Sequence, residues 1–211
     1  MKFETALRLV GDLPTFETGM LLAGAVDPAD VRRQLSRWKT RGRLEQLRRG
    51  LYVFAQPYRK VEPHPFVVAN RIQAGSYVSM QSALAFAGMI PEYVAAVTSV
   101  CTARPTQRHT PLGSFIYRHI KTELFWGYRR LELSAGQQAF VAYPEKALLD
   151  LFYLHPGADD PAYIEQLRLQ NLDLFNLQRF DAMVERVDRP KLRRAAELLR
   201  DLCMADDFEP L

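Results

Sequence analysis

The sequence predicts an α+β protein with two domains, and three observations support this prediction. Helical spacings of apolar residues fill much of residues 2–40, and two short strand-like stretches follow them. A proline-rich segment at residues 55–65 then interrupts the pattern. After it, strand-like stretches come before a series of helical ones. We therefore expect one domain at residues 1–58 and a mixed α+β domain with a helical C-terminus at residues 59–211.

The sequence of residues 1–58 predicts three helices and a β-hairpin. Residues 2–10 and 15–23 predict two short helices from their apolar spacing. A capping aspartate and a proline in the first turn predict a third helix over residues 27–40. Residues 43–46 and 51–54 favour strands, and a glycine between them permits a tight turn. Three helices followed by a hairpin are typical of a winged helix-turn-helix.

Basic side chains concentrate in the third helix and the hairpin. Residues 31–60 hold ten basic residues and one acid, a net charge of +9, whereas the rest holds 18 basic and 23 acidic residues, a net charge of −5. Val31, Leu35 and Trp38 share one helix face, which predicts that this face packs on the domain. The opposite face and its flanks carry arginines and short polar side chains, which suit base edges and phosphates. We predict DNA-binding residues at Arg32, Arg33, Gln34, Ser36, Arg37, Lys39, Thr40, Arg41 and Arg43, and at Arg48 and Arg49 on the hairpin tip.

The sequence of residues 59–211 predicts a mixed or antiparallel sheet followed by helices. Strands are expected at residues 97–102, 115–119 and 140–143, with a weaker one at 130–133. Helices are expected at residues 66–73, 80–87, 144–154, 163–169, 177–187 and 191–204.

We expect no catalytic residues, metal site or cofactor. The four histidines lack metal-ligand spacing, the two cysteines are far apart, and no nucleophile or phosphate-loop motif is present. Glu145 and Lys146 after Pro144 resemble a nuclease pair, although they also suit an ordinary helix start. One alternative is a nuclease-like second domain with Glu123, Glu145 and Asp150 around a metal. Another is a second domain that only binds a protein partner.

The sequence also predicts a cytoplasmic protein without a membrane partner. No apolar run approaches the roughly 18 residues of a membrane helix. The first residues lack the pattern of a signal peptide. Two isolated thiols agree with a reducing compartment.

Several segments resemble the AbiEi-type antitoxins, predicted transcriptional regulators of bacterial abortive-infection (type IV toxin–antitoxin) systems. The segments are LRRGLYVF (47–54), YVSMQSALAFAGMIPE (77–92), VTSVCTAR (97–104), TPLGSFIYRHIK (110–121), FWGY (125–128) and AYPEKALLDLFYL (142–154). The resemblance implies an autorepressor that binds inverted repeats in its own promoter. It also implies antitoxin activity for the second domain, against a nucleotidyltransferase-like toxin that is countered directly or indirectly. No catalytic role carries over to the motif residues, so we expect no enzyme.

Overall fold

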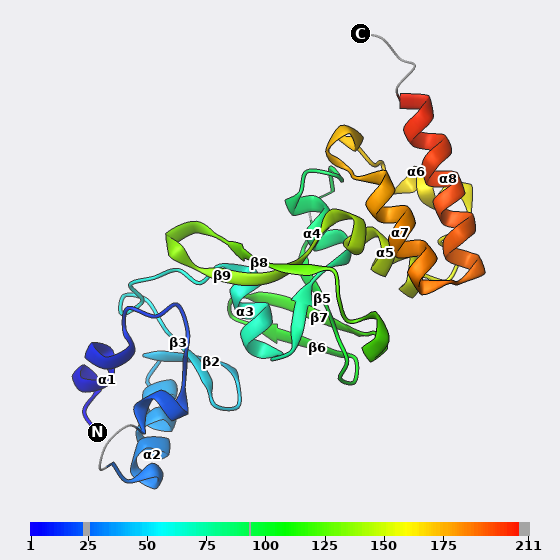
Figure 1. The fold of residues 1–211 in the computed structure, drawn as a ribbon. Coiled ribbons are helices and arrows are strands. Elements are labelled where there is room, and N and C mark those ends of the chain that lie inside the picture. Colours follow the sequence, from blue (N-terminus) through cyan, green and yellow to red (C-terminus); the bar gives the residue numbers. More distant parts are fainter. Residues whose placement is uncertain (23–25, 93, 207–211) are drawn as a thin grey trace.

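The chain is an α+β protein, described by a computed structural model for residues 1–22, 26–92 and 94–206 (Figure 1). Its described residues form a three-stranded sheet and a six-stranded sheet. A small N-terminal part lies at one end, the larger sheet lies in the middle, and the last helices lie at the other end (Figure 1). Among the described helices, none is both long and apolar enough to cross a membrane.

The described residues of the N-terminal part form two α-helices, one 3-10 helix and a small antiparallel sheet. The strands run in the order β1-β3-β2, with Phe16 opposite Tyr52 and Leu44 opposite Phe54. The expected first and third helices and the hairpin are confirmed. The elements are α1 (Phe3–Val10), β1 (Phe16–Glu17), η1 (Thr18–Leu21), α2 (Pro28–Thr40), β2 (Leu44–Arg48) and β3 (Leu51–Phe54).

The prediction of a helix at residues 15–23 is wrong. The chain instead forms strand β1 and the 3-10 helix η1, while residue 23 lies outside the described residues. Pro14 and Gly19 both disfavour an α-helix here. Phe16 is 1% exposed, and Thr18 donates its backbone N–H to the carbonyl of Gly50 at 2.9 Å. Pairing with a strand distant in sequence therefore overrides the local helical spacing.

The second part contains a mixed six-stranded sheet in the order β6-β7-β5-β4-β9-β8. The pairs β4–β9 and β5–β7 are parallel, and the other pairs are antiparallel. Its first elements are α3 (Pro65–Ile72), β4 (Ser76–Val78), α4 (Met80–Phe86), β5 (Ala96–Cys101), β6 (Thr106–Thr110), β7 (Gly113–His119) and η2 (Thr122–Leu124). The remaining elements are β8 (Tyr128–Glu132), η3 (Ser134–Gly136), β9 (Gln138–Ala142), α5 (Pro144–Leu154), α6 (Pro161–Gln166), η4 (Leu172–Leu174), α7 (Leu177–Val187) and α8 (Pro190–Asp206).

Two strands of this sheet were not predicted. Strand β4 is only three residues long, too short to show an alternating pattern. Strand β6, with the sequence TQRHT, lies at the edge of the sheet, exposes three of its five residues and buries none of them fully. An edge strand made of polar residues has no apolar period to detect.

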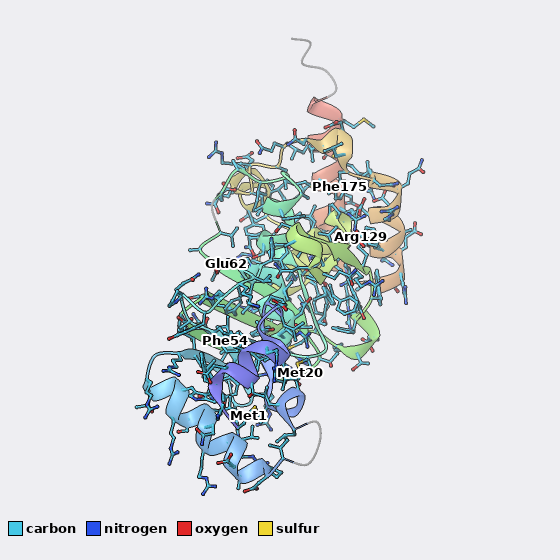
Figure 2. All side chains as sticks on the ribbon, turned by 90° about the vertical axis from the view of Figure 1, so that its left-hand side faces the viewer. Met1, Met20, Phe54, Glu62, Arg129 and Phe175 are labelled. Atoms are coloured by element: carbon cyan, nitrogen blue, oxygen red, sulfur yellow. The ribbon has the colours of Figure 1, made fainter. Side chains whose placement is uncertain are left out.

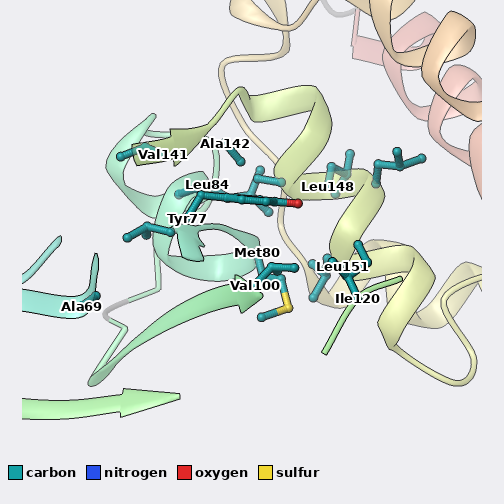
Figure 3. Close-up of a cluster of buried hydrophobic side chains, with 14 of the residues drawn as sticks. Ala69, Tyr77, Met80, Leu84, Val100, Ile120, Val141, Ala142, Leu148 and Leu151 are labelled. Carbon is teal, nitrogen blue, oxygen red and sulfur yellow. The ribbon is translucent and has the colours of Figure 1, made fainter. Parts of the chain in front are cut away.

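The described core divides into two clusters that meet at the hairpin. Phe3, Trp38 and Phe54 form edge-to-face ring pairs in the N-terminal cluster, with centroids 5.3 and 5.9 Å apart. Leu51 and Val53, on the opposite face of β3, belong to the larger cluster of the second part. Figure 3 shows part of that larger cluster around the sheet and α5. Strand β3 therefore packs against both parts at once.

The segment between the two parts is held by side chains. Arg59 is 9% exposed and donates to the carbonyl of Phe54 at 2.8 Å. Its guanidinium also reaches the carboxylates of Glu62 and Glu45, at 2.8 and 3.1 Å. Gln137 donates to the carbonyl of Glu62 at 2.9 Å. These contacts fix the chain between β3 and α3.

Candidate nucleic-acid interface

Helix α2 is set in place by its cap and by one apolar face. Asp27 accepts the backbone N–H of Ala29 at 2.9 Å, which satisfies one of the free donors at the start of the helix. Val31, Leu35 and Trp38 are buried in the N-terminal core, as the periodicity predicts. The opposite face of the helix is consequently presented to solvent.

Side chains of the outer face of α2 extend away from the rest of the chain (Figure 2). Gln34 is half-buried at the edge of this face and donates to Asp30 at 3.5 Å. Predicted site residues that the structure exposes here are Arg32, Arg33, Ser36, Arg37, Lys39, Thr40 and Arg41.

Some side chains of this face have partners within the chain. The guanidinium of Arg33 lies 3.5 Å from Asp30, and Lys39 donates to the side chain of Gln46 at 2.9 Å. Thr40 donates to the carbonyl of Ser36 at 3.1 Å. These are exposed contacts of the kind that a polyanion can displace.

Other cations of α2 and the hairpin have no acidic or hydrogen-bonding partner within the described residues. Within the described residues, no hydrogen bond or ion pair occupies the guanidinium groups of Arg32, Arg37, Arg41 and Arg49. Arg43 differs, because its guanidinium lies 4.8 Å from the ring centroid of Phe3. Arg43 thereby packs on the N-terminal core and leaves only part of its surface to solvent.

The two arginines of the hairpin tip point in different directions. Arg49 is exposed, next to Gly50 with its φ of +81°. Arg48 donates to the carboxylate of Glu17 at 3.0 Å and to the backbone carbonyl of Arg71 at 3.1 Å. Arg48 therefore joins the hairpin to β1 and α3, while Arg49 remains accessible.

A second group of polar side chains lies deep in the larger core. Tyr77 and Ser79 donate their hydroxyls to Asp150 at 3.0 and 2.8 Å, and Lys146 forms an ion pair with the same carboxylate. All four residues are at most 1% exposed. The Lys146 ammonium also lies 5.0 Å from the ring centroid of Trp126.

Burial governs the charges of this network. It raises the pKa of Asp150 and lowers the pKa of Lys146, because each charged form loses its water. The contact between the two groups opposes both shifts. The hydroxyl of Tyr77, buried beside this carboxylate, has a raised pKa and remains a hydrogen-bond donor. No solvent-exposed atom is offered for chemistry, so the network acts on the stability of the fold.

The nuclease-like alternative requires Glu123, Glu145 and Asp150 to lie together, but each of them contacts a different partner. Glu123 is exposed and lies 3.7 Å from Lys121. Glu145 accepts the backbone N–H of Asn176 at 3.0 Å, whereas Asp150 belongs to the buried network. Across residues 1–22, 26–92 and 94–206, no group of three or more His, Cys, Asp and Glu is arranged to hold a metal ion. That alternative therefore lacks the acidic cluster on which it depends.

Sequence reasoning missed the roles of Asp150, Arg59 and Arg48. One signal was present for Asp150, since Lys146 stands four residues before it on a helix that is mostly apolar after its first turn. A charged pair inside such a helix indicates a buried ion pair. The partners of Arg59 and Arg48 come from distant segments and left no local signal.

Comparisons with known proteins show a likeness in fold. No protein-family model matches the sequence, and no curated protein matches it. Among solved structures, the crystal structure of the RV2827C protein from Mycobacterium tuberculosis is similar, with a TM-score of 0.53 and 20% identity. The match covers 93% of this chain and 75% of that chain. At this identity the likeness concerns the fold alone.

Proposed function

We propose that this protein is a sequence-specific DNA-binding transcriptional regulator, an autorepressor that acts as the antitoxin of a type IV toxin–antitoxin system. The main support is the solvent-facing side of α2, where Arg32, Arg37 and Arg41 have no partner within the described chain. Clustered cations on a helix wide enough to fill a major groove are suited to a polyanion. The net charge of +9 over residues 31–60 agrees with this partner.

The order of elements supports a winged helix-turn-helix at residues 1–58. A helix, a short strand, a turn, a second helix and a hairpin follow one another, and the strands pair in the order β1-β3-β2. In this proposal η1 takes the place of the middle helix, and α2 is the recognition helix. The hairpin β2–β3 is the wing, which carries Arg49 beside the bound duplex.

The proposed contacts divide into two kinds. Arg33, Ser36, Arg37 and Thr40 lie on the outermost face of α2 and read base edges in the major groove. The flanking side chains hold phosphates, and this group consists of Arg32, Gln34, Lys39, Arg41 and Arg49. Arg43 and Arg48 support the surface from behind, because their guanidinium groups are bound within the chain.

The second part supplies the proposed antitoxin activity, and this rests on the family resemblance of its motifs. Several motif residues, Tyr77, Ser79, Lys146 and Asp150, form the buried network and serve stability in this proposal. The partner is a nucleotidyltransferase-like toxin, countered directly or through control of its expression. We assign no catalytic step to this part, and we propose a cytoplasmic location.

A fluorescence-anisotropy titration against the DNA upstream of the coding sequence tests the proposal. A scrambled duplex of the same length serves as the control, and both are measured at several salt concentrations. With about four phosphates neutralised, the logarithm of the association constant should fall against the logarithm of the salt concentration with a slope of about −3.6. Equal and weak affinity for both duplexes would refute sequence-specific regulation.

Variants separate the two kinds of contact. Arg37→Ala should reduce the preference for the upstream duplex, by about 1–3 kcal/mol if one base contact is lost. Arg49→Ala should weaken binding to both duplexes and make the salt slope shallower by about 1. Arg104→Ala changes an exposed arginine outside α2 and the hairpin, and should leave both quantities unchanged.

A further inference from the structure

A pocket with a volume of about 390 Å³ lies where the N-terminal part meets the larger sheet. Glu17 of β1 lines one side of it, and α3, β8 and β9 line the others. A neighbouring pocket of about 420 Å³ shares Val67, Arg71 and Gln138 with it. Concave sites of this size, with aromatic walls and a few polar groups, are typical of small-molecule binding.

One wall of the pocket is aromatic and firmly supported. Tyr128 contacts Phe125 and Phe140, whose ring centroids are 5.3 and 5.9 Å from its own. Behind the pocket, Tyr128 stacks on Tyr77 at 4.6 Å, and Tyr77 is held by Asp150. Phe140 remains 46% exposed although it borders this cluster of rings. The wall therefore offers a preformed surface to another flat ring.

The polar side of the pocket carries one uncompensated cation. The carboxylate of Glu17 is paired with Arg48, and the Asn70 amide accepts the backbone N–H of Phe140 at 2.6 Å. Within the described residues, no carboxylate or carbonyl oxygen engages the exposed guanidinium of Arg71. An arginine free to form two parallel hydrogen bonds is suited to a phosphate or a carboxylate.

The pocket is also connected to the hairpin. Arg48 binds Glu17 and the carbonyl of Arg71, and both of these residues line the pocket. A molecule in the pocket would therefore lie beside two of the residues that bind the Arg48 side chain.

We propose that this pocket binds a small planar aromatic anion. The ring lies against Phe140 and Tyr128, and the oxyanion binds Arg71. Bound ligand steadies the Arg48 bridge and with it the hairpin. The binding site is independent of the proposed function, since it does not require that the chain bind DNA. A nucleotide phosphate and an aromatic carboxylate share the required chemistry, and the choice of probes distinguishes them.

Isothermal titration calorimetry on the full chain tests the site. The probes are the four ribonucleoside 5′-monophosphates, the four matching nucleosides, phenylpyruvate and indole-3-acetate. We expect saturable binding of one molecule per chain by at least one anionic probe. If that probe is a monophosphate, the matching nucleoside should bind more weakly. Preference for the monophosphates identifies a nucleotide site, and preference for the two acids identifies an aromatic carboxylate site.

Substitutions locate the binding. Arg71→Ala and Phe140→Ala should each weaken the preferred probe by about tenfold or more, as expected from loss of a charge-assisted hydrogen bond or a ring contact. Arg71→Lys should weaken it less. Phe86→Ala removes a phenylalanine of similar exposure that does not line the pocket, and should leave the affinity unchanged.

Two results would overturn the proposal. One is the absence of saturable binding by every probe at millimolar concentration. The other is unchanged affinity in both pocket variants, which would place the binding elsewhere. Thermal melting of each variant verifies folding, and Phe140→Leu replaces Phe140→Ala if the latter does not fold. A pocket that binds ligand in a chain without DNA affinity would refute the proposed function while leaving this site intact.

Discussion

Replacing Asp150 with asparagine should convert the buried ion pair into an isolated lysine. The asparagine side chain keeps nearly the same volume, and its Oδ1 can still accept the hydroxyls of Tyr77 and Ser79, because both bond to the same carboxylate oxygen. Its amide NH2 then faces Lys146, so the lysine loses both the negative charge and the acceptor of its hydrogen bond. Lys146 is 0% exposed, and its ammonium lies 5.6 and 5.0 Å from the ring centroids of Tyr77 and Trp126, neither of which carries a negative charge. Removing one member of a buried pair typically costs about 3–5 kcal/mol.

The destabilisation caused by Asp150→Asn has an upper limit, because Lys146 can release its proton. Its ordinary pKa is 10.5, so losing the proton at pH 7 costs about 4.8 kcal/mol. A buried ammonium that costs more than this becomes neutral instead. We therefore expect the free energy of unfolding to fall by about 3–5 kcal/mol at pH 7, a large share of the stability of a typical domain.

The pH dependence gives the sharper test. With the folded-state pKa of Lys146 lowered by burial, the unfolded chain binds more protons between that pKa and 10.5. The stability lost by the variant should accordingly return as pH rises, by up to about 1.4 kcal/mol per pH unit. Urea unfolding followed by circular dichroism at pH 7, 8 and 9 measures this.

A matched control is Asp173→Asn, which removes an exposed carboxylate from η4. It should alter the free energy of unfolding by less than about 0.5 kcal/mol. If Asp150→Asn behaved like this control, with no gain toward high pH, the reasoning about the buried pair would be refuted.

Three further predictions concern the same fold. Gly127→Ala should destabilise by about 1–3 kcal/mol in thermal melts, because its φ is +76° and an added Cβ would lie 2.8 Å from Cγ of Lys146; an unchanged melting temperature would contradict this. Arg59→Ala should lower the free energy of unfolding in urea by about 1–3 kcal/mol and increase proteolysis between the two parts, since three acceptors lose their donor. A protease pattern like that of the wild type would argue that Arg59 does not hold this segment in place. Burial lowers the pKa of His64, whose Nδ1 accepts the N–H of Phe66, so stability should fall as pH drops below 6.5, and His64→Asn should remove this dependence while keeping a helix cap.

Much of the N-terminal surface follows from local pattern. Helix α2 appears where a capping aspartate, an early proline and an apolar stripe predict it, and its arginines are exposed as expected. These features depend on neighbours within a few residues, which sequence spacing reports directly. The same holds for α5, which begins at Pro144 as predicted.

Pairing between segments distant in sequence could not be predicted from local spacing. Residues 16–21 have helical spacing, yet β1 pairs with β3 about 35 positions later, and strand pairing decided the outcome. Arg48 looked like a free tip residue, but Arg71, 23 positions away, supplies the carbonyl that binds it. A segment's own sequence carries no record of such partners.

The sequence by itself determined an α+β chain, the amphipathic character of α2 with its arginine-bearing face, and the concentration of positive charge in residues 31–60. Only the tertiary structure decided which charges remain available. Tyr77 and Asp150 meet across 73 positions, and Arg48 turns inward while Arg49 stays in solvent. The physical reason is that a hydrogen bond or ion pair requires two groups within about 3 Å, and only the folded chain sets that distance between remote residues.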